Sequence, residues 1–578
     1  MATGPKLDAA RRSAACQLIL TLCAIATLAT HSFAQQSPGD ATRLAAAQTA
    51  LDSGRWQEAA TLAAGPAGQS AEFDLIAGLA LAHLQHWTEA RASLDRGRLK
   101  APADARFPVE LAGIAYKTKD VSAAKRDLHA ALRLRATDAY AQEFLGTLYF
   151  LDGNIEAALK YWNPLEKPRL ASVSIAPPPH LAPALVNRIV QFNAPQVLSV
   201  RSLLATTARL DNLEVFPRSR LELVPTPTGN YEATVHAALR AGWMDSPIEN
   251  AVSLFSGLPY STVYPEFYNL GHRAINFTSL ARWDSEKRRI YASLTTPLLD
   301  NPALRLRFFS DVRNENWNLS TTYFGGTPLT DVNVRRATGG LELHEVENGL
   351  WSWSAGLAFT SRSFRNLPAV PSANSQPFFT NGNSLSVWLR AERPVLRVPE
   401  HRFRLDAEGE LRPGRNFADG MGAFTTLRGS LQAHWLPRAK GDDYEMHAQL
   451  RGGLTMGKQT LDDLFQLGIE RDNDLWLRGH SGTIDGRKGA APLGRRYFLS
   501  SWEMDKNVYE GAFFVVKVGP FLDSGATADS SALFGSQRWL WDTGAQCKIR
   551  ILGTVTVLLS YGRDLRGGKN TFYSSALH

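Results

Sequence analysis

Two patterns of apolar and polar positions divide the chain. From Ala41 to Pro168, apolar residues recur at helical spacing with short breaks, which predicts helix hairpins. From about Gly242 to the end of the sequence, apolar residues alternate with small or polar ones. A clear example of the alternation is Trp351, Trp353, Ala355, Leu357 and Phe359. A period of two predicts strands with one apolar and one polar face.

The alternating region is long enough for a β-barrel. It spans about 335 residues, more than a single β-sandwich uses. Roughly ten residues per strand and ten per connection give about sixteen antiparallel strands. An apolar face suits lipid and a polar face suits a lumen, so residues 242–578 are predicted to form a transmembrane antiparallel β-barrel.

Residues 1–34 have the pattern of a cleaved signal peptide. Three basic residues up to Arg12 precede an apolar run from Leu18 to Ala29, and Ser32-Phe33-Ala34 supplies small residues for cleavage. The run is shorter than the roughly 20 residues of a spanning helix. We therefore expect export, with the barrel in the cell outer membrane and the preceding domains in the periplasm.

Composition narrows the function classes. A hydrophobic fraction of 44% with 20% charged residues is ordinary for a folded chain. Cys16 and Cys23 lie in the predicted signal, so the mature chain keeps only Cys547 and forms no internal disulfide. The net charge of +8 is spread along the chain and, together with export, argues against a nucleic-acid partner.

Motifs for enzyme chemistry are missing from the sequence. There is no His-Glu-x-x-His, no paired cysteine motif and no complete phosphate loop. Gly479-His480-Ser481-Gly482 approaches a nucleophile elbow, but Thr483 replaces its second glycine. The thirteen histidines show no ligand spacing. We expect a protein that is not an enzyme and carries neither cofactor nor metal.

The helical region repeats with a period of 34 residues. Alanines mark the period and large apolar residues follow each by four, at Ala90, Leu94, Ala124, Leu128, Ala158 and Trp162. This resembles the tetratricopeptide repeat, in which small residues let paired helices approach and large ones fill the gap. The resemblance covers residues 41–170 and implies a protein-binding face that includes Tyr116, Tyr149 and Trp162. A plain helical spacer is the alternative.

A short module separates the repeats from the barrel region. Pro177-Pro178-Pro179 predicts a stiff linker over residues 171–183. Residues 184–241 then show an extended run from Val186 to Phe192, a helix from about Pro195, and two alternating strands joined at Thr228-Gly229-Asn230. This β-α-β-β order before a barrel resembles a single polypeptide-transport-associated (POTRA) domain.

Two motifs near the C-terminus carry a family resemblance. Leu477, Arg478, Gly479 and His480 resemble the hydrophobic-Arg-Gly-aromatic motif of BamA-type outer-membrane assembly factors, the bacterial surface antigen family, with His480 in place of the usual aromatic residue. Phe521, Asp523 and Gly525 resemble the Phe-x-Asp-x-Gly barrel strand of the same family. The resemblance implies that Arg478 lies at the tip of a loop folded into the lumen and pairs with Asp523, because a guanidinium can hold a carboxylate bidentately.

Three function classes remain open. The first is assembly of outer-membrane proteins or translocation of polypeptide or lipid, with the barrel in outer-membrane lipid and the repeats recruiting periplasmic client polypeptides or accessory proteins. The second is an exopolysaccharide export porin with tetratricopeptide repeats, which needs acidic and aromatic lumen residues and no Arg-Gly/Asp pair. A passive porin is the third. A passive porin would not need a repeat array. The expected fold is multidomain, with all-α repeats, a small α+β module and a barrel of about 16 strands.

Overall fold

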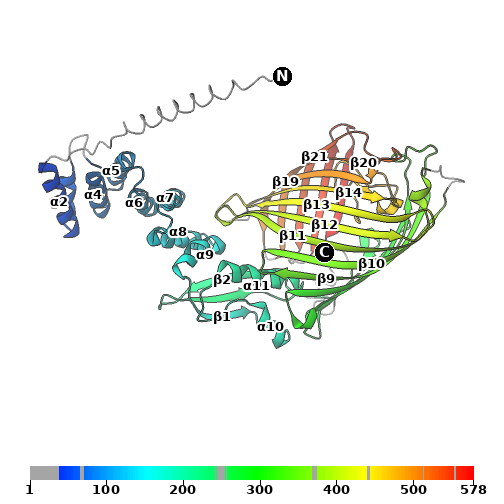
Figure 1. The fold of residues 1–578 in the computed structure, drawn as a ribbon, viewed down its shortest axis with the longest axis horizontal. Coiled ribbons are helices and arrows are strands. Elements are labelled where there is room, and N and C mark those ends of the chain that lie inside the picture. Colours follow the sequence, from blue (N-terminus) through cyan, green and yellow to red (C-terminus); the bar gives the residue numbers. More distant parts are fainter. Residues whose placement is uncertain are drawn as a thin grey trace, which may run out of the picture. The chain divides into compact units, whose positions relative to one another are not determined.

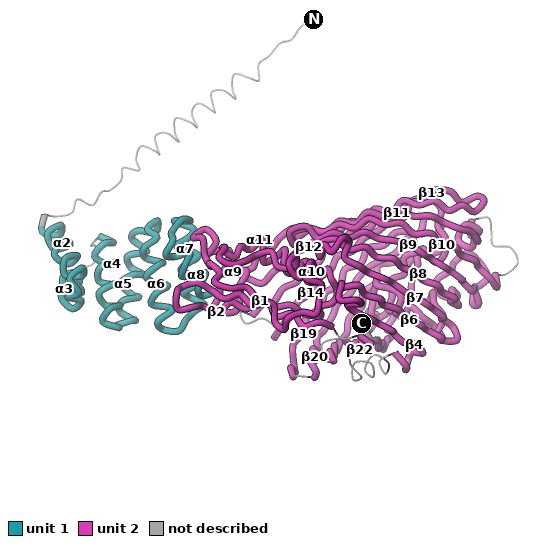
Figure 2. Tube along the Cα trace, turned by 90° about the horizontal axis from the view of Figure 1, so that it is seen from below, with its two compact units in different colours: residues 1–148 teal, residues 149–578 magenta. Residues whose placement is uncertain are grey.

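The computed structural model describes residues 38–64, 70–240, 242–243, 254, 257–367, 374–438, 443–511, 513–551 and 555–577. The predicted signal peptide, residues 1–34, lies outside these ranges. The chain divides into two compact units, residues 1–148 and 149–578 (Figure 2). None of the described helices is long and apolar enough to cross a membrane.

Helices that pack in consecutive pairs form the first unit. They are α2 (Pro38–Asp52), α3 (Trp56–Ala63), α4 (Ala71–His83), α5 (Trp87–Lys100), α6 (Arg106–Lys117) and α7 (Val121–Leu134), followed by the start of α8 (Ala139–Leu151). Ala90 and Ala124 are fully buried. A Cβ added to Gly78 would lie 2.5 Å from Leu94 Cγ, so Leu94 fills the space beside the glycine. The small positions of the 34-residue period are therefore points of close helix contact.

A small mixed module opens the second unit, after helix α9 (Ile155–Trp162). Its elements are β1 (Leu170–Ala176), α10 (Pro183–Ile189), α11 (Val200–Asn212), β2 (Arg220–Pro225) and β3 (Tyr231–His236), in the sheet order β1-β3-β2. Strand β1 is parallel to β3, and β2 is antiparallel to it.

Two predictions for this module are wrong. Residues 171–176 form β1, although the prolines predict a linker there, because the strand gains a ladder with β3 that the sequence does not display. Residues 183–189 form helix α10, so the predicted extended run from Val186 begins inside a helix. Leu185 and Ile189, four residues apart, are both fully buried, so one helical face packs into the core.

The rest of the second unit is one large sheet, drawn from green to red in Figure 1. Its first strands are β4 (Thr262–Val263), β5 (Glu266–Leu270), β6 (Ile275–Trp283), β7 (Lys287–Pro297), β8 (Leu304–Trp317), β9 (Val332–Glu347), β10 (Trp351–Arg365), β11 (Gly382–Val398), β12 (Phe403–Asn416), β13 (Gly422–Trp435) and β14 (Tyr444–Gly457). The others are β16 (Thr483–Ile484), β17 (Arg487–Lys488), β19 (Arg496–Glu510), β20 (Phe514–Ala528), β21 (Leu540–Ile551), β22 (Val555–Asp564) and β23 (Asn570–Leu577).

Neighbouring long strands of this sheet are antiparallel throughout, and in the strand order β23 neighbours β4. The sheet holds eighteen strands in the described residues, against about sixteen predicted. A count of ten residues per strand does not register β4, β16 and β17, which have two residues each, and without these three the sheet has fifteen strands.

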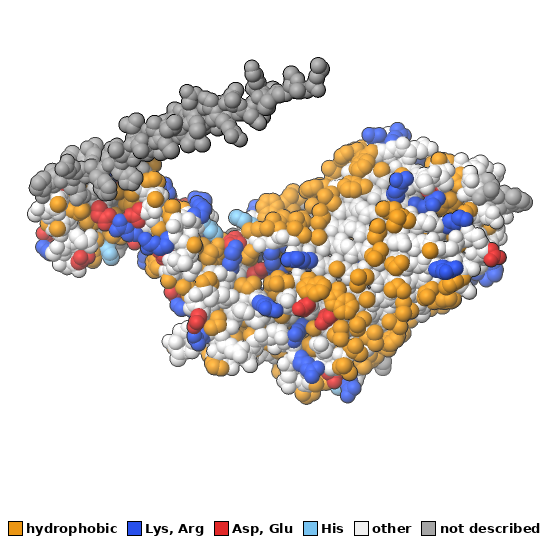
Figure 3. All heavy atoms as spheres, viewed as in Figure 1, with side chains coloured by type: hydrophobic (Ala, Val, Ile, Leu, Met, Phe, Trp, Pro, Cys, Tyr) orange, Lys and Arg blue, Asp and Glu red, His pale blue; other side chains and the backbone are white. Residues whose placement is uncertain are grey.

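The two faces of the large sheet differ in polarity. Apolar side chains stand exposed on the outer face, among them Ile290, Leu389 and Trp502, and Figure 3 shows hydrophobic side chains spread over this surface. The alternate positions point inward and are polar yet buried, as at Thr360, Ser386 and Glu410. An apolar outside and a polar inside reverse the order of a soluble domain and match a sheet solvated by lipid.

The small module bonds to one end of the large sheet, here called the module end. Asn212 Nδ2 donates to Pro302 O at 3.0 Å. Lys160 Nζ of helix α9 donates to Glu400 Oε1 at 2.5 Å, in the turn between β11 and β12. The turns at this end of the strands therefore face the module.

Candidate functional site

A long connection between β14 and β19 occupies the inner face of the sheet. The two strands pair directly with each other, and residues 458–495 between them are called the inner loop. The loop departs from the wall between β14 and β19, and its short strands β16 and β17 rejoin the sheet at β8 through Lys488 and Trp317. The loop holds its own small ladder of β15 (Phe465–Gln466) and β18 (Leu493–Gly494). Leu477 is fully buried in an apolar cluster with Leu467 and Leu499, which anchors the base of the loop tip to the wall.

Arg478 at the loop tip is held by Asp523 of β20. Its Nη2 donates to Asp523 Oδ1 at 2.7 Å and its Nε to Asp523 Oδ2 at 2.8 Å, a bidentate pair, and its backbone N–H donates to the same carboxylate at 3.1 Å. Arg478 is 5% exposed and Asp523 is fully buried. The structure thus brings together the two residues that the motifs single out.

Further strands complete the surroundings of Arg478. Its Nη1 donates to Glu503 Oε2 of β19 and to Gln546 Oε1 of β21, both at 2.8 Å. The guanidinium carbon lies 3.9 Å from the ring centroid of Phe521, the first residue of the wall motif, in a cation–π contact. Gly525, the last residue of that motif, is buried further along the same strand.

Gly479 and His480 extend the same anchor to the last strands. A Cβ on Gly479 would lie 2.6 Å from Asp564 N, so only glycine fits at this close approach. Gly479 N–H donates to Asp542 Oδ2 of β21 at 2.6 Å. His480 lies between two carboxylates, with Nδ1 3.0 Å from Asp542 and Nε2 3.6 Å from Asp564 of β22. His480 stands where the motif it resembles has Phe or Tyr, and its imidazole forms an ion pair that a Phe or Tyr ring cannot make.

The protonation state of His480 depends on the two carboxylates beside it. Burial by itself lowers the pKa of His480, but the hydrogen bond and charge of Asp542 and the charge of Asp564 outweigh burial and raise the pKa above its ordinary value. The positive charge of Lys569 opposes this rise in the pKa of His480. His480 is consequently protonated to a higher pH in the folded protein than in the unfolded chain.

We expect the loop tip to loosen as the pH rises. Because the folded pKa is raised, the stabilisation by His480 is complete below the ordinary value of about 6.5 and is lost as the pH rises through the folded value. The measurement is the rate of proteolysis within the inner loop, expressed as the ratio of wild type to His480→Phe at each pH. His401→Phe, at an exposed histidine in a turn, is the control. A ratio independent of pH would contradict the role of the imidazole.

A second anchor, not found by sequence reasoning, ties the inner loop to the first strands. Asp472 is 2% exposed and accepts from Arg282 Nη1 of β6 and Arg289 Nη1 of β7, both at 2.7 Å. Lys488 Nζ lies 2.9 Å from Glu315 Oε1 of β8 and 3.7 Å from Asp472. Further along the sheet, Asp462 pairs with Arg336 and Arg362. The only sequence signal was a carboxylate-rich gap between two long alternating runs.

The predicted protein-binding face of the repeats needs correction. Tyr149 and Trp162 are 4% and 3% exposed, so neither can contact a client. They are covered because Tyr149 stacks on Tyr161 and Trp162 packs against Tyr231 of β3, where the module follows the last helix. Tyr116 is 40% exposed.

Tyr116 belongs to a group of neighbouring aromatic residues in the first unit. Tyr140 is 64% exposed, and its ring and that of Tyr116 both contact Phe144, with centroids 6.0 and 5.6 Å apart. We call Tyr116, Tyr140 and Phe144 the aromatic patch. It combines exposed apolar area with a polar hydroxyl tip, a composition enriched at protein interfaces.

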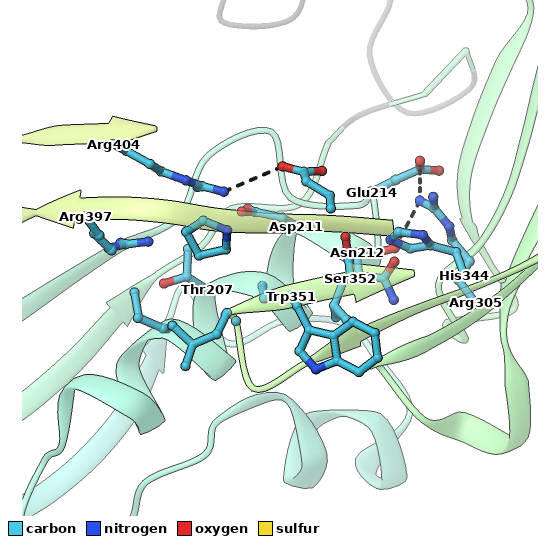
Figure 4. A pocket seen from close by; sticks show the side chains of 17 residues that line it. Thr207, Asp211, Asn212, Glu214, Arg305, His344, Trp351, Ser352, Arg397 and Arg404 are labelled. Carbon is cyan, nitrogen blue, oxygen red and sulfur yellow. Dashed lines mark hydrogen bonds and ion pairs between the residues drawn. The ribbon is translucent and has the colours of Figure 1, made fainter. Parts of the chain in front are cut away.

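A separate cavity of about 420 Å³ lies between helix α11 and the module end of the sheet (Figure 4). Arg305 of β8 points toward Glu214 and pairs with its carboxylate, while Trp351 and Arg397 line the other side. Its lining comes from both the module and the strand ends. We interpret it as the junction that holds the module against the sheet.

Comparisons with known proteins give limited guidance. No family model matches the chain, and no curated protein matches it. Among solved structures, CdiB from Escherichia coli matches with 13% identity and a TM-score of 0.47, over 71% of this chain and 77% of that chain. CdiB from Acinetobacter baumannii matches with 12% identity and a TM-score of 0.43, over 80% and 86%. BamA from Haemophilus ducreyi lacking POTRA domains 1–3 matches with 11% identity and a TM-score of 0.41, over 71% and 85%. These values are too low to assign a family.

Proposed function

We propose that the chain is a closed transmembrane barrel of the outer membrane, similar to BamA-type factors, that assembles outer-membrane proteins or translocates polypeptide or lipid. The observation that carries the proposal is the buried bidentate pair of Arg478 and Asp523 at the tip of the inner loop. The exposed apolar outer face supports the membrane part of the proposal. We assign no catalytic role to any residue.

The inner loop argues for this class over the two alternatives. A porin for sugar chains or small solutes needs an open path, whereas here a loop of 38 residues, 458–495, is bonded to strands on both sides of the interior. The inner carboxylates also pair with arginines, as at Asp311 and Glu410, instead of standing free to line an acidic path. A pinned loop fits a protein whose interior is not a permanently open path for sugar chains or small solutes.

In the proposed arrangement, the helices of the first unit are tetratricopeptide repeats in the periplasm and the module is POTRA-like. The aromatic patch then recruits client polypeptides or accessory proteins. Unpaired strands of a client would add to an edge strand of the three-stranded module sheet, β1 or β2, by main-chain hydrogen bonds, a mode that gives affinity without sequence specificity.

The membrane part of this proposal predicts heat-modifiable migration. A closed antiparallel ladder leaves no free edge to unravel, so an unheated sample in dodecyl sulfate should migrate as a compact species and a boiled sample more slowly. Fractionation should place the chain with outer membranes. Recovery as soluble periplasmic protein would contradict the barrel.

The recruitment part is tested by photo-crosslinking in cells. A photoreactive residue at Tyr140 should capture nascent outer-membrane polypeptides, and one at Ile290, on the exposed outer face of β7, should capture lipid and no client. Tyr140→Ala, in a chain carrying the crosslinker at Tyr116, should lower client capture several-fold. Capture of polysaccharide or of nothing at Tyr140 would favour an export porin or a passive porin instead.

A further inference from the structure

A cluster of two histidines and one glutamate lies on the inner face of the sheet, beside a cavity that Arg478 and Glu503 of the inner loop anchor also line. His434 of β13 and His447 of β14 are direct cross-strand partners. Glu445 precedes His447 by two, so its side chain emerges on the same face. The side chains are partly exposed, His434 by 38%, His447 by 40% and Glu445 by 21%. The two histidines line a cavity of about 450 Å³ near the module end.

The nitrogen and oxygen atoms of this cluster converge. His434 Nε2 lies 2.8 Å and His447 Nε2 2.9 Å from the same atom, Glu445 Oε1. The imidazole ring centroids are 4.6 Å apart at an interplanar angle of 33°. The candidate ligand atoms of the three residues all lie within 4.8 Å of one another.

We propose that His434, Glu445 and His447 bind a divalent transition-metal ion such as Zn²⁺. Two imidazole nitrogens and one carboxylate oxygen are a donor set that Zn²⁺ accepts, with a fourth position left for water. Bonds of about 2.0–2.2 Å in a tetrahedron put ligand atoms about 3.3–3.5 Å apart, so each of the two imidazole–Glu445 pairs needs to open by only about half an ångström. The fourth position would face the 450 Å³ cavity.

Lys517 of β20 is the competitor for this ion. Its Nζ bonds Glu445 through the second carboxylate oxygen, Oε2, so that Oε1 remains with the histidines. A cation on Oε1 would be repelled by the ammonium group. The affinity of the site is therefore set by the balance between the metal and Lys517.

The second group of this kind in the described residues, His480 with Asp542 and Asp564, is a weaker candidate. It offers one imidazole instead of two, and its carboxylates already accept N–H groups from Gly479 and Arg566. The first of these hydrogen bonds holds the loop tip and the second holds the turn that follows β22, and both compete with a metal for the carboxylates.

The test is Zn²⁺ titration of the full chain in detergent after treatment with a chelator, followed by calorimetry. One equivalent should bind, and His434→Ala and His447→Ala should each lower the affinity at least about tenfold. Lys517→Met should raise the affinity. His344→Ala, at a histidine of β9 that lines the junction cavity, is the matched control and should leave binding unchanged.

A second readout does not depend on the variants being folded. Cu²⁺ bound to the wild-type chain should give an electron paramagnetic resonance spectrum with coupling to two imidazole nitrogens. Coupling to one nitrogen, no saturable Zn²⁺ binding, or binding unaffected by both alanine substitutions would overturn the proposal.

Discussion

Arg478→Ala should release the inner loop while leaving the large sheet folded. The side chain is buried and bonded to Asp523, Glu503 and Gln546, so its loss leaves the buried Asp523 carboxylate without its cation, whereas Glu503 keeps its pair with Lys548. Removing one partner of a desolvated ion pair costs about 3–5 kcal/mol. The expected readouts are faster proteolysis within residues 468–490 and failure to complement a null strain.

A double-mutant cycle that combines Arg478→Ala with Asp523→Ala tests whether the effect arises from the contact between these two residues. The double variant should be little worse than Arg478→Ala alone, because both changes remove the same contact and coupled changes do not add. Asp523→Ala should be the milder single change, since Arg478 keeps Glu503. Arg438→Ala, in an exposed pair with Asp443, is the control and should cost about 0–1 kcal/mol. Simple additivity would mean that Arg478 and Asp523 act independently.

Asp472→Asn should destabilise the other side of the inner loop by a similar amount. The carboxylate neutralises Arg282, which is 3% exposed, and shares Arg289 with Asp311. Without it Arg282 keeps a long contact to Thr262 Oγ1 at 3.3 Å and only the charge of Glu470 among the carboxylates that act on it, and breaking a buried ion pair costs about 3–5 kcal/mol. The temperature at which the compact gel species disappears should fall.

Two controls separate charge burial from local packing. Asp474→Asn removes a carboxylate of the same loop that is 79% exposed, and it should have little effect. Arg282→Met combined with Asp472→Leu should recover part of the loss, because apolar side chains of similar volume replace a buried ion pair at little cost. Equal effects of Asp472→Asn and Asp474→Asn would contradict the proposed role of Asp472 in anchoring the inner loop.

The pattern of apolar and polar residues was sufficient to predict a helix or strand where its period determines which face is buried. The alternation from Trp351 to Phe359 lies entirely within β10, and its apolar residues Leu357 and Phe359 are exposed on the outer face. The 34-residue spacing of Ala90, Ala124 and Ala158 places three fully buried residues. Such elements are encoded by neighbours in the sequence, because helices and strands each repeat their faces at a constant period.

Contacts between distant segments could not be obtained in this way. Arg282 and Asp472 are 190 residues apart and Arg478 and Asp523 are 45 apart, and only the second pair had motifs that pointed to it. His434 and His447 show no ligand spacing, because strand register, not sequence distance, makes them neighbours. Register is decided by the whole ladder.

The same limit explains the corrections at the junction of repeats and module. Tyr149 and Trp162 have the residue types of a binding face, and they are buried because Tyr161 and Tyr231 cover them. Residues 171–176 resemble a linker until β3 supplies a ladder partner. The polarity of a side chain and the period of its element can be read from the sequence, whereas its exposure depends on which other segment packs against it, because burial is a property of pairs of surfaces.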